Sequence, residues 1–141
     1  MKSSTEISSA TKPMFDRLSD SLKVAGAGNG AGLFVMVAAM NTISVEHPHA
    51  VLLLKPTALI FALGVALFGV AYLFLTYAYI YSEHYGALLE QAGRGETMKY
   101  PPDGAAKASM SYMQRTMICG LASAFVFFVG FVIACTALVR Y

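Results

Sequence analysis

The feature that most constrains this chain is the stretch Pro56–Tyr81, which contains no Asp, Glu, Lys, Arg or His. A lipid hydrocarbon core of ~30 Å needs about 20 helical residues to cross it. Backbone N–H and C=O groups find no water there, so a single spanning segment must be a helix. The sequence therefore predicts a transmembrane helix that begins at Pro56, next to Lys55, since proline suits the first helical turn.

The composition indicates that this helix is not alone. The 141 residues are 57% hydrophobic and only 13% charged, whereas soluble domains carry about 25% charge. Two more apolar runs, residues 24–43 and 116–139, are long enough to span. We predict an all-α integral membrane protein with three transmembrane helices in one domain, residues 13–141, with a cytoplasmic helical loop over 82–115. The net charge of +2 is small and dispersed, which argues against a nucleic-acid partner.

The N-terminal residues are polar. Residues 1–12 are rich in Ser and Thr without periodicity, which predicts disorder. Residues 13–23 place apolar side chains on one helical face: Met14, Phe15, Leu18 and Leu22. This pattern predicts a short amphipathic helix on the membrane surface. The alternative is an extension of the first span.

Small residues fill the first half of the first span, and Gly28 and Gly32 form a G-x-x-x-G pair around Asn29. In a bilayer such residues let another helix approach closely, and an Asn can hydrogen-bond across the contact. We predict a helix-packing interface made of Gly28, Asn29, Gly32, Gly64, Gly69, Gly120 and Gly130. A flexible helix entry is the alternative, and a nucleotide-binding loop is disfavoured because no strand precedes the glycines.

Two other patterns accompany the spans. A tyrosine cluster ends the second span and predicts an aromatic belt at the lipid–water boundary: Tyr72, Tyr77, Tyr79, Tyr81 and Tyr85. The same helix should continue to Gly93 and Gly95, and Asp103 should cap the third helix. Met110, Met113 and Met117 form a stripe, which predicts either an adaptable docking surface or ordinary packing.

Residues able to do chemistry are few. Glu46, His47 and His49 lie in the expected loop 44–55 and form a weak metal-ligand pattern, for which a solvated turn is the preferred interpretation. His84 is expected to be an ordinary interfacial residue. Cys119 and Cys135 lie 16 residues apart on one expected helix, a rise of about 24 Å that excludes a disulfide between them. We expect no catalysis, metal or cofactor, and the uncharged spans disfavour proton-coupled pumps and voltage sensors.

The distribution of Lys and Arg predicts an orientation. The N-terminal segment and the second loop hold eight of these residues: Lys2, Lys12, Arg17, Lys23, Arg94, Lys99, Lys107 and Arg115. The first loop and the C-terminus hold only Lys55 and Arg140. By the positive-inside rule the N-terminus should be cytoplasmic and the C-terminus periplasmic.

Short motifs give a loose resemblance. Leu22-Lys23 followed by Asn29-Gly30-Ala31, then Phe61-Ala62-Leu63-Gly64 and Phe127-Phe128-Val129-Gly130, resemble those of small uncharacterised bacterial inner-membrane proteins with three or four spans. The resemblance covers residues 22–85 and the third span. It implies a bacterial inner-membrane location and carries no activity.

These patterns favour a non-catalytic membrane subunit, with an accessory, scaffold or regulatory role, that packs with itself or with a larger membrane complex. An oligomeric pore-forming or holin-like effector is the alternative, although three-span holins have the opposite orientation and a charged tail. A small channel or a lipid-binding protein, with the tyrosines as a platform, is a third hypothesis. Assembly size in mild detergent and membrane depolarisation distinguish the first two.

Overall fold

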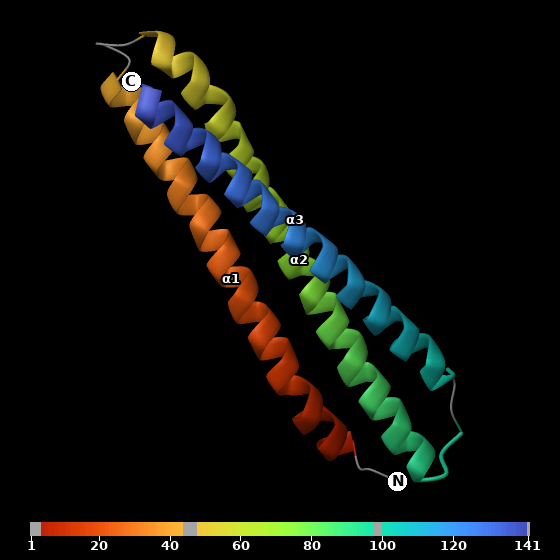
Figure 1. The fold of residues 1–141 in the computed structure, drawn as a ribbon. Coiled ribbons are helices and arrows are strands. Elements are labelled where there is room, and N and C mark those ends of the chain that lie inside the picture. Colours follow the sequence, from red (N-terminus) through yellow and green to blue (C-terminus); the bar gives the residue numbers. More distant parts are fainter. Residues whose placement is uncertain (1–3, 44–47, 98–99, 141) are drawn as a thin grey trace. The chain divides into compact units, whose positions relative to one another are not determined.

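The computed structural model describes residues 4–43, 48–97 and 100–140, and side chains over 12–42, 51–52, 54–97 and 100–137. These residues form three helices in the order α1 (Ser4–Ile43), α2 (Pro48–Gly93) and α3 (Pro102–Arg140) (Figure 1). The described chain is all-helical, as predicted. Each helix contains a segment long and apolar enough to cross a membrane.

The first helix differs from the expected arrangement. α1 runs without interruption from Ser4 through Pro13 to Ile43. No separate amphipathic helix therefore precedes the first span, and the backbone is helical from Ser4 where disorder was expected. Adding a residue to an existing helix needs no new nucleus, so a long apolar helix can extend into a Ser- and Thr-rich segment.

The start of the second helix was also predicted wrongly. α2 begins at Pro48, and Pro56 lies inside it. The expected loop over 44–55 is thus helical from Pro48 onward. Both prolines suit a first helical turn, and the apolar residues 51–54 continue the helix; among them Leu54 is buried.

The end of the second helix agrees with the prediction. α2 ends at Gly93, and Gly95 has a positive φ of 72°, a conformation that glycine adopts without a steric penalty. The N–H of Gly95 donates to the carbonyl of Ala92 (3.1 Å), and that of Glu96 donates to Gln91 (3.2 Å). These bonds satisfy carbonyls that the helix end leaves unpaired.

The third helix begins slightly before the predicted cap. α3 starts at Pro102, so Asp103 lies in its first turn and is not the residue before it. A carboxylate in this turn still favours the helix, because it faces the positive end of the helix dipole.

The contacts group the chain into two compact units. Unit 1 combines Met1–Ser21 with Ala71–Ile118, and unit 2 combines Leu22–Val70 with Cys119–Tyr141. Unit 2 has a core from all three helices: Met36, Leu54, Ala58, Phe61 and Ala134, with Leu33, Ala39, Met40 and Phe127 packed against it. In unit 1 the Phe15 ring packs edge-on against Tyr79 (5.4 Å between centroids). The single domain expected over residues 13–141 stays a prediction.

Candidate functional site

Several glycines of unit 2 pack directly against aromatic rings of neighbouring helices. A Cβ at Gly26 would lie 2.6 Å from Cγ of Phe68, and one at Gly28 would lie 3.2 Å from Cε2 of Phe127. At Gly32 a Cβ would overlap the ring of Phe61. At Gly26 and Gly32 the rings therefore occupy space that only a glycine leaves open, whereas at Gly28 a Cβ would make a tight contact that a small shift of the ring could relieve.

The other glycines of the expected interface fall into two groups. A Cβ at Gly120 would lie 2.8 Å from Leu22 Cδ2, and one at Gly130 would lie 3.1 Å from Phe61 Cζ. Gly64 lies against the Asn29 side chain, whereas a Cβ at Gly69 would meet nothing within 4 Å. Gly69 is therefore outside these close contacts. The packing of these rings against the glycines, and the part of Gly26 in it, were not predicted from the sequence. Their signal was the spacing of Phe61 and Phe68, which lie seven residues, or two turns, apart on α2.

A polar node joins the three helices inside unit 2. Asn29 of α1 and Ser123 of α3 are both fully buried. The Asn29 Nδ2 group donates to the Ser123 carbonyl (3.2 Å) and Oγ (3.1 Å), and to the carbonyl of Ala25 (3.0 Å). Ser123 Oγ in turn donates to the carbonyl of Gly64 on α2 (2.8 Å). One amide and one hydroxyl thus tie α1, α2 and α3 together.

The orientation of the Asn29 amide follows from its surroundings. Two of the three acceptors around Nδ2 are backbone carbonyls, which could not donate to an oxygen in that place. The other amide atom, Oδ1, is buried, makes no hydrogen bond and lies against Gly64. An unpaired buried acceptor is costly, and the glycine Cα–H groups beside it can offset part of that cost through weak C–H···O contacts.

The node lies well inside the charge-free part of each helix. Asn29 follows Lys23 by six residues, Gly64 follows Lys55 by nine, and Ser123 follows Arg115 by eight. At 1.5 Å per residue these spacings correspond to about 9, 14 and 12 Å along the helices. The polar node therefore lies about 9 to 14 Å along each helix from that helix's nearest charged residue.

A second cluster lies in unit 1, between α2 and α3. The Tyr112 ring stacks on Tyr77 and on Tyr81, each at 5.5 Å between centroids, and lies 6.1 Å from Phe74. The Arg115 guanidinium lies 5.6 Å from the Tyr112 centroid and 5.9 Å from that of Phe74. We call these five residues the aromatic–arginine cluster.

The five tyrosines of the expected aromatic belt have different surroundings in the structure. Tyr77 and Tyr81 belong to the aromatic–arginine cluster, while Tyr79 donates a hydrogen bond to Glu83. Tyr72 is exposed and Tyr85 is partly buried. Tyr112, the centre of the cluster, was not predicted from the sequence; its signal was a lone tyrosine three residues before Arg115, the last cation ahead of the apolar run of α3.

The methionine stripe is largely uncovered. Met110 and Met117 are exposed, and Met113 is half-buried. Docking of a partner on this stripe stays a prediction.

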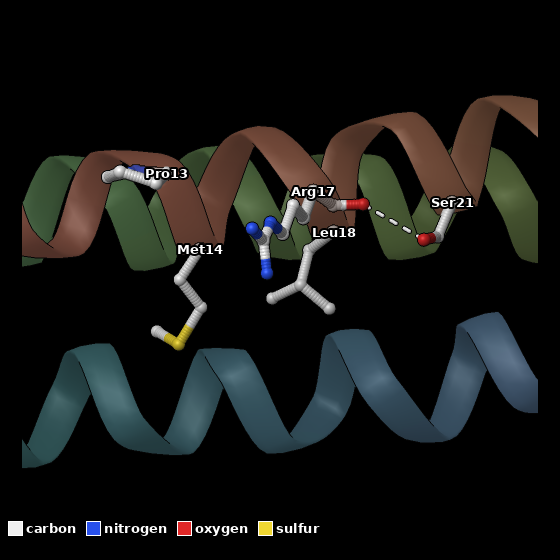
Figure 2. A pocket seen from close by; sticks show the side chains of 5 residues that line it. All are labelled: Pro13, Met14, Arg17, Leu18 and Ser21. Carbon is white, nitrogen blue, oxygen red and sulfur yellow. Dashed lines mark hydrogen bonds between the residues drawn. The ribbon is translucent and has the colours of Figure 1, made fainter.

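Two shallow pockets lie on unit 1. The larger, about 460 Å³, is lined on α1 by Pro13, Met14, Arg17, Leu18 and Ser21. Figure 2 shows Met14 and Leu18 extending from α1 toward the neighbouring α3 ribbon, with the Arg17 guanidinium between them. Ser21 Oγ donates to the Arg17 carbonyl (2.9 Å). The second pocket, about 210 Å³, is lined by Lys12, Phe15, Asp16, Ser19, Tyr72, Leu75, Thr76 and Tyr79.

The weak metal pattern falls largely outside the described structure. Glu46 and His47 are not among the described residues, and neither is the side chain of His49. His84 is exposed on α2. Over the part of the chain with described side chains, no three His, Cys, Asp or Glu residues group as metal ligands.

Comparison with protein-family models, curated proteins and solved structures finds no match to this chain. Any function must therefore be argued from the residues themselves.

Proposed function

We propose that the chain is an integral membrane protein and acts as a non-catalytic subunit that assembles through helix packing. Support comes from how little of its apolar surface the chain covers by itself. In the most apolar 18-residue stretch of each helix, the buried share is only 22% for α1, 28% for α2 and 17% for α3. A surface this apolar needs lipid or protein around it.

The glycine contacts argue against an assembly surface at the glycines themselves. In unit 2 the notches at Gly26, Gly32 and Gly64 are already occupied by Phe68, Phe61 and Asn29. They hold the chain's own helices together and are not free for a partner. We therefore propose that assembly with a partner uses another surface of the chain.

The observation that carries the proposal is a stripe on α3, the helix whose most apolar stretch is the least buried of the three. Its residues are spaced alternately by four and three, and the four large ones are between 61% and 69% exposed: Leu121, Phe125, Phe128 and Val132, continued by the exposed Cys135. This spacing produces the seam of a left-handed helix pair. We propose that the α3 stripe packs against the same stripe of a second copy, and that a larger complex would use the same face.

The proposal includes a location. The bacterial inner membrane is the location that the resemblance to small bacterial membrane proteins implies. Eight of the ten Lys and Arg residues lie on one expected side, which supports a cytoplasmic N-terminus and a periplasmic C-terminus. Between Arg115 and Arg140 the third helix has no charged residue, so a water-filled pore along its stripe would have an apolar lining. The pore-forming alternative stays a hypothesis without a feature that favours it.

The native cysteines provide the test. Cys135 lies on the stripe and is exposed, whereas Cys119 is half-buried. In lipid bilayers, oxidation with copper phenanthroline should cross-link the unmodified protein and the Cys119→Ser variant into dimers. The Cys135→Ser variant should remain monomeric on a denaturing gel.

Two outcomes would contradict this assignment. Equal cross-linking of both single-serine variants would show that collisions, not the stripe, bring the thiols together. A protein that stays monomeric in bilayers, with no partner retained in mild detergent, would exclude the subunit role.

A further inference from the structure

The aromatic–arginine cluster has the composition of an anion site. Tyr112 stacks on Tyr77 and on Tyr81, with 5.5 Å between ring centroids in each pair, and the Arg115 guanidinium lies over Tyr112 and Phe74. The bond from Ser109 Oγ to the Ala78 carbonyl (2.9 Å) fixes the register of α2 and α3 beside it. The rings restrict the guanidinium, so little of its conformational freedom remains to be lost when it binds a ligand.

Arg115 differs from another exposed arginine of the same unit. Arg94 is held by carboxylates, with Nη1 at 3.6 Å from Glu90 and Nε at 2.8 Å from Glu96. Within the described residues, the contacts of the Arg115 guanidinium are with the two rings. A planar guanidinium held by rings keeps its N–H donors for a phosphate, which it can bind through two parallel hydrogen bonds.

The position of Arg115 along α3 favours a lipid over other anions as the ligand. It is the last charged residue before the apolar run that ends at Arg140, and the exposed Ile118 and Leu121 follow it. Tyr77 and Tyr81 stand at the end of the charge-free part of α2. Phenol groups prefer the lipid–water boundary, where headgroup phosphates lie and acyl chains could extend past the apolar residues.

We propose that Arg115 and the hydroxyls of Tyr77, Tyr81 and Tyr112 bind the phosphate of an anionic phospholipid, with its acyl chain along α3 at Ile118. The inference rests on the membrane location proposed above. The guanidinium supplies the charge, and the phenols supply additional hydrogen-bond donors.

The test titrates the full-length protein, purified in a mild detergent, with phosphatidylglycerol, phosphatidylcholine or inorganic phosphate, and counts bound molecules by native mass spectrometry. The Arg115→Gln variant should bind phosphatidylglycerol roughly five- to tenfold more weakly at its tightest site. Tyr112→Phe keeps the stacking ring but removes a hydroxyl, and should lower the same affinity about two- to threefold.

Two arginines serve as matched controls. Arg94→Gln removes a cation already paired with carboxylates, and Arg17→Gln removes the cation of the pocket in Figure 2. Neither should change the tightest phosphatidylglycerol affinity, and Arg115→Gln should leave phosphatidylcholine binding unchanged.

Three results would overturn the site. An equal loss of phosphatidylglycerol affinity in all three arginine variants would indicate general charge attraction. A loss confined to Arg17→Gln would place the site at the pocket of Figure 2. Inorganic phosphate that binds as tightly as the lipid would indicate an anion site without lipid specificity. Cross-linking of Cys135 in bilayers, measured on the same variants, separates these results from failure of the proposed membrane subunit. A lipid site that fails while the cross-link persists overturns the present inference alone.

Discussion

Replacing Gly64 by alanine tests the polar node most directly, because a second glycine on the same helix offers a matched control. A Cβ at Gly64 would be forced onto the Asn29 amide, whereas one at Gly69 would meet nothing within 4 Å. Both substitutions add the same methyl group to α2 and the same gain in helix propensity. The difference between the two variants therefore isolates the contact with Asn29.

The size of the difference follows from the contacts. Moving the amide would break its two bonds to Ser123, each worth about 0.6 kcal/mol between membrane helices. Overfilling a packed site costs about 1–3 kcal/mol more. We expect Gly64→Ala to be less stable than Gly69→Ala by about 2–4 kcal/mol.

The half-buried Cys119 reports opening of unit 2. In a Cys135→Ser background, maleimide labelling of Cys119 would be followed as SDS is added to mixed micelles, and the transition for Gly64→Ala should come at a lower SDS mole fraction. In an Asn29→Ala background the amide is gone, so Gly64→Ala should cost little more than Gly69→Ala. Equal transitions for the two single variants, or no rescue by Asn29→Ala, would refute the geometry of the node.

Two further predictions test the hydroxyl of the polar node and the orientation of the chain in the membrane. Ser123→Ala removes the hydroxyl that donates to Gly64 and accepts from Asn29, so it should destabilise unit 2 by about 1 kcal/mol in the labelling assay; no change would show that the node contributes nothing. In a cysteine-free background, a membrane-impermeant maleimide added to intact bacterial cells should label His49→Cys but not Glu96→Cys, and the reverse pattern would invert the proposed orientation.

Long, local features could be read from the sequence. The three apolar runs predicted three helices, and each is present with a segment long enough to span a membrane. Gly93 and Gly95 correctly marked the end of α2, because a positive φ is a property of one residue and its neighbours. The start of α2 was missed because Pro48 and Pro56 are equally suited to a first turn, and only the continuing helix distinguishes them.

The sequence by itself determined that this chain forms long apolar helices with small residues and few polar ones among them, since charge and residue size are local properties. The tertiary structure alone decided which of those residues meet. Gly64 and Gly69 look alike in sequence, yet one receives the Asn29 side chain and the other faces open space. The physical reason is register: the pairing of Asn29 with Ser123, and of Tyr112 with Tyr77 and Tyr81, depends on how far each helix is shifted along its neighbour, and hydrophobic periodicity does not specify that shift.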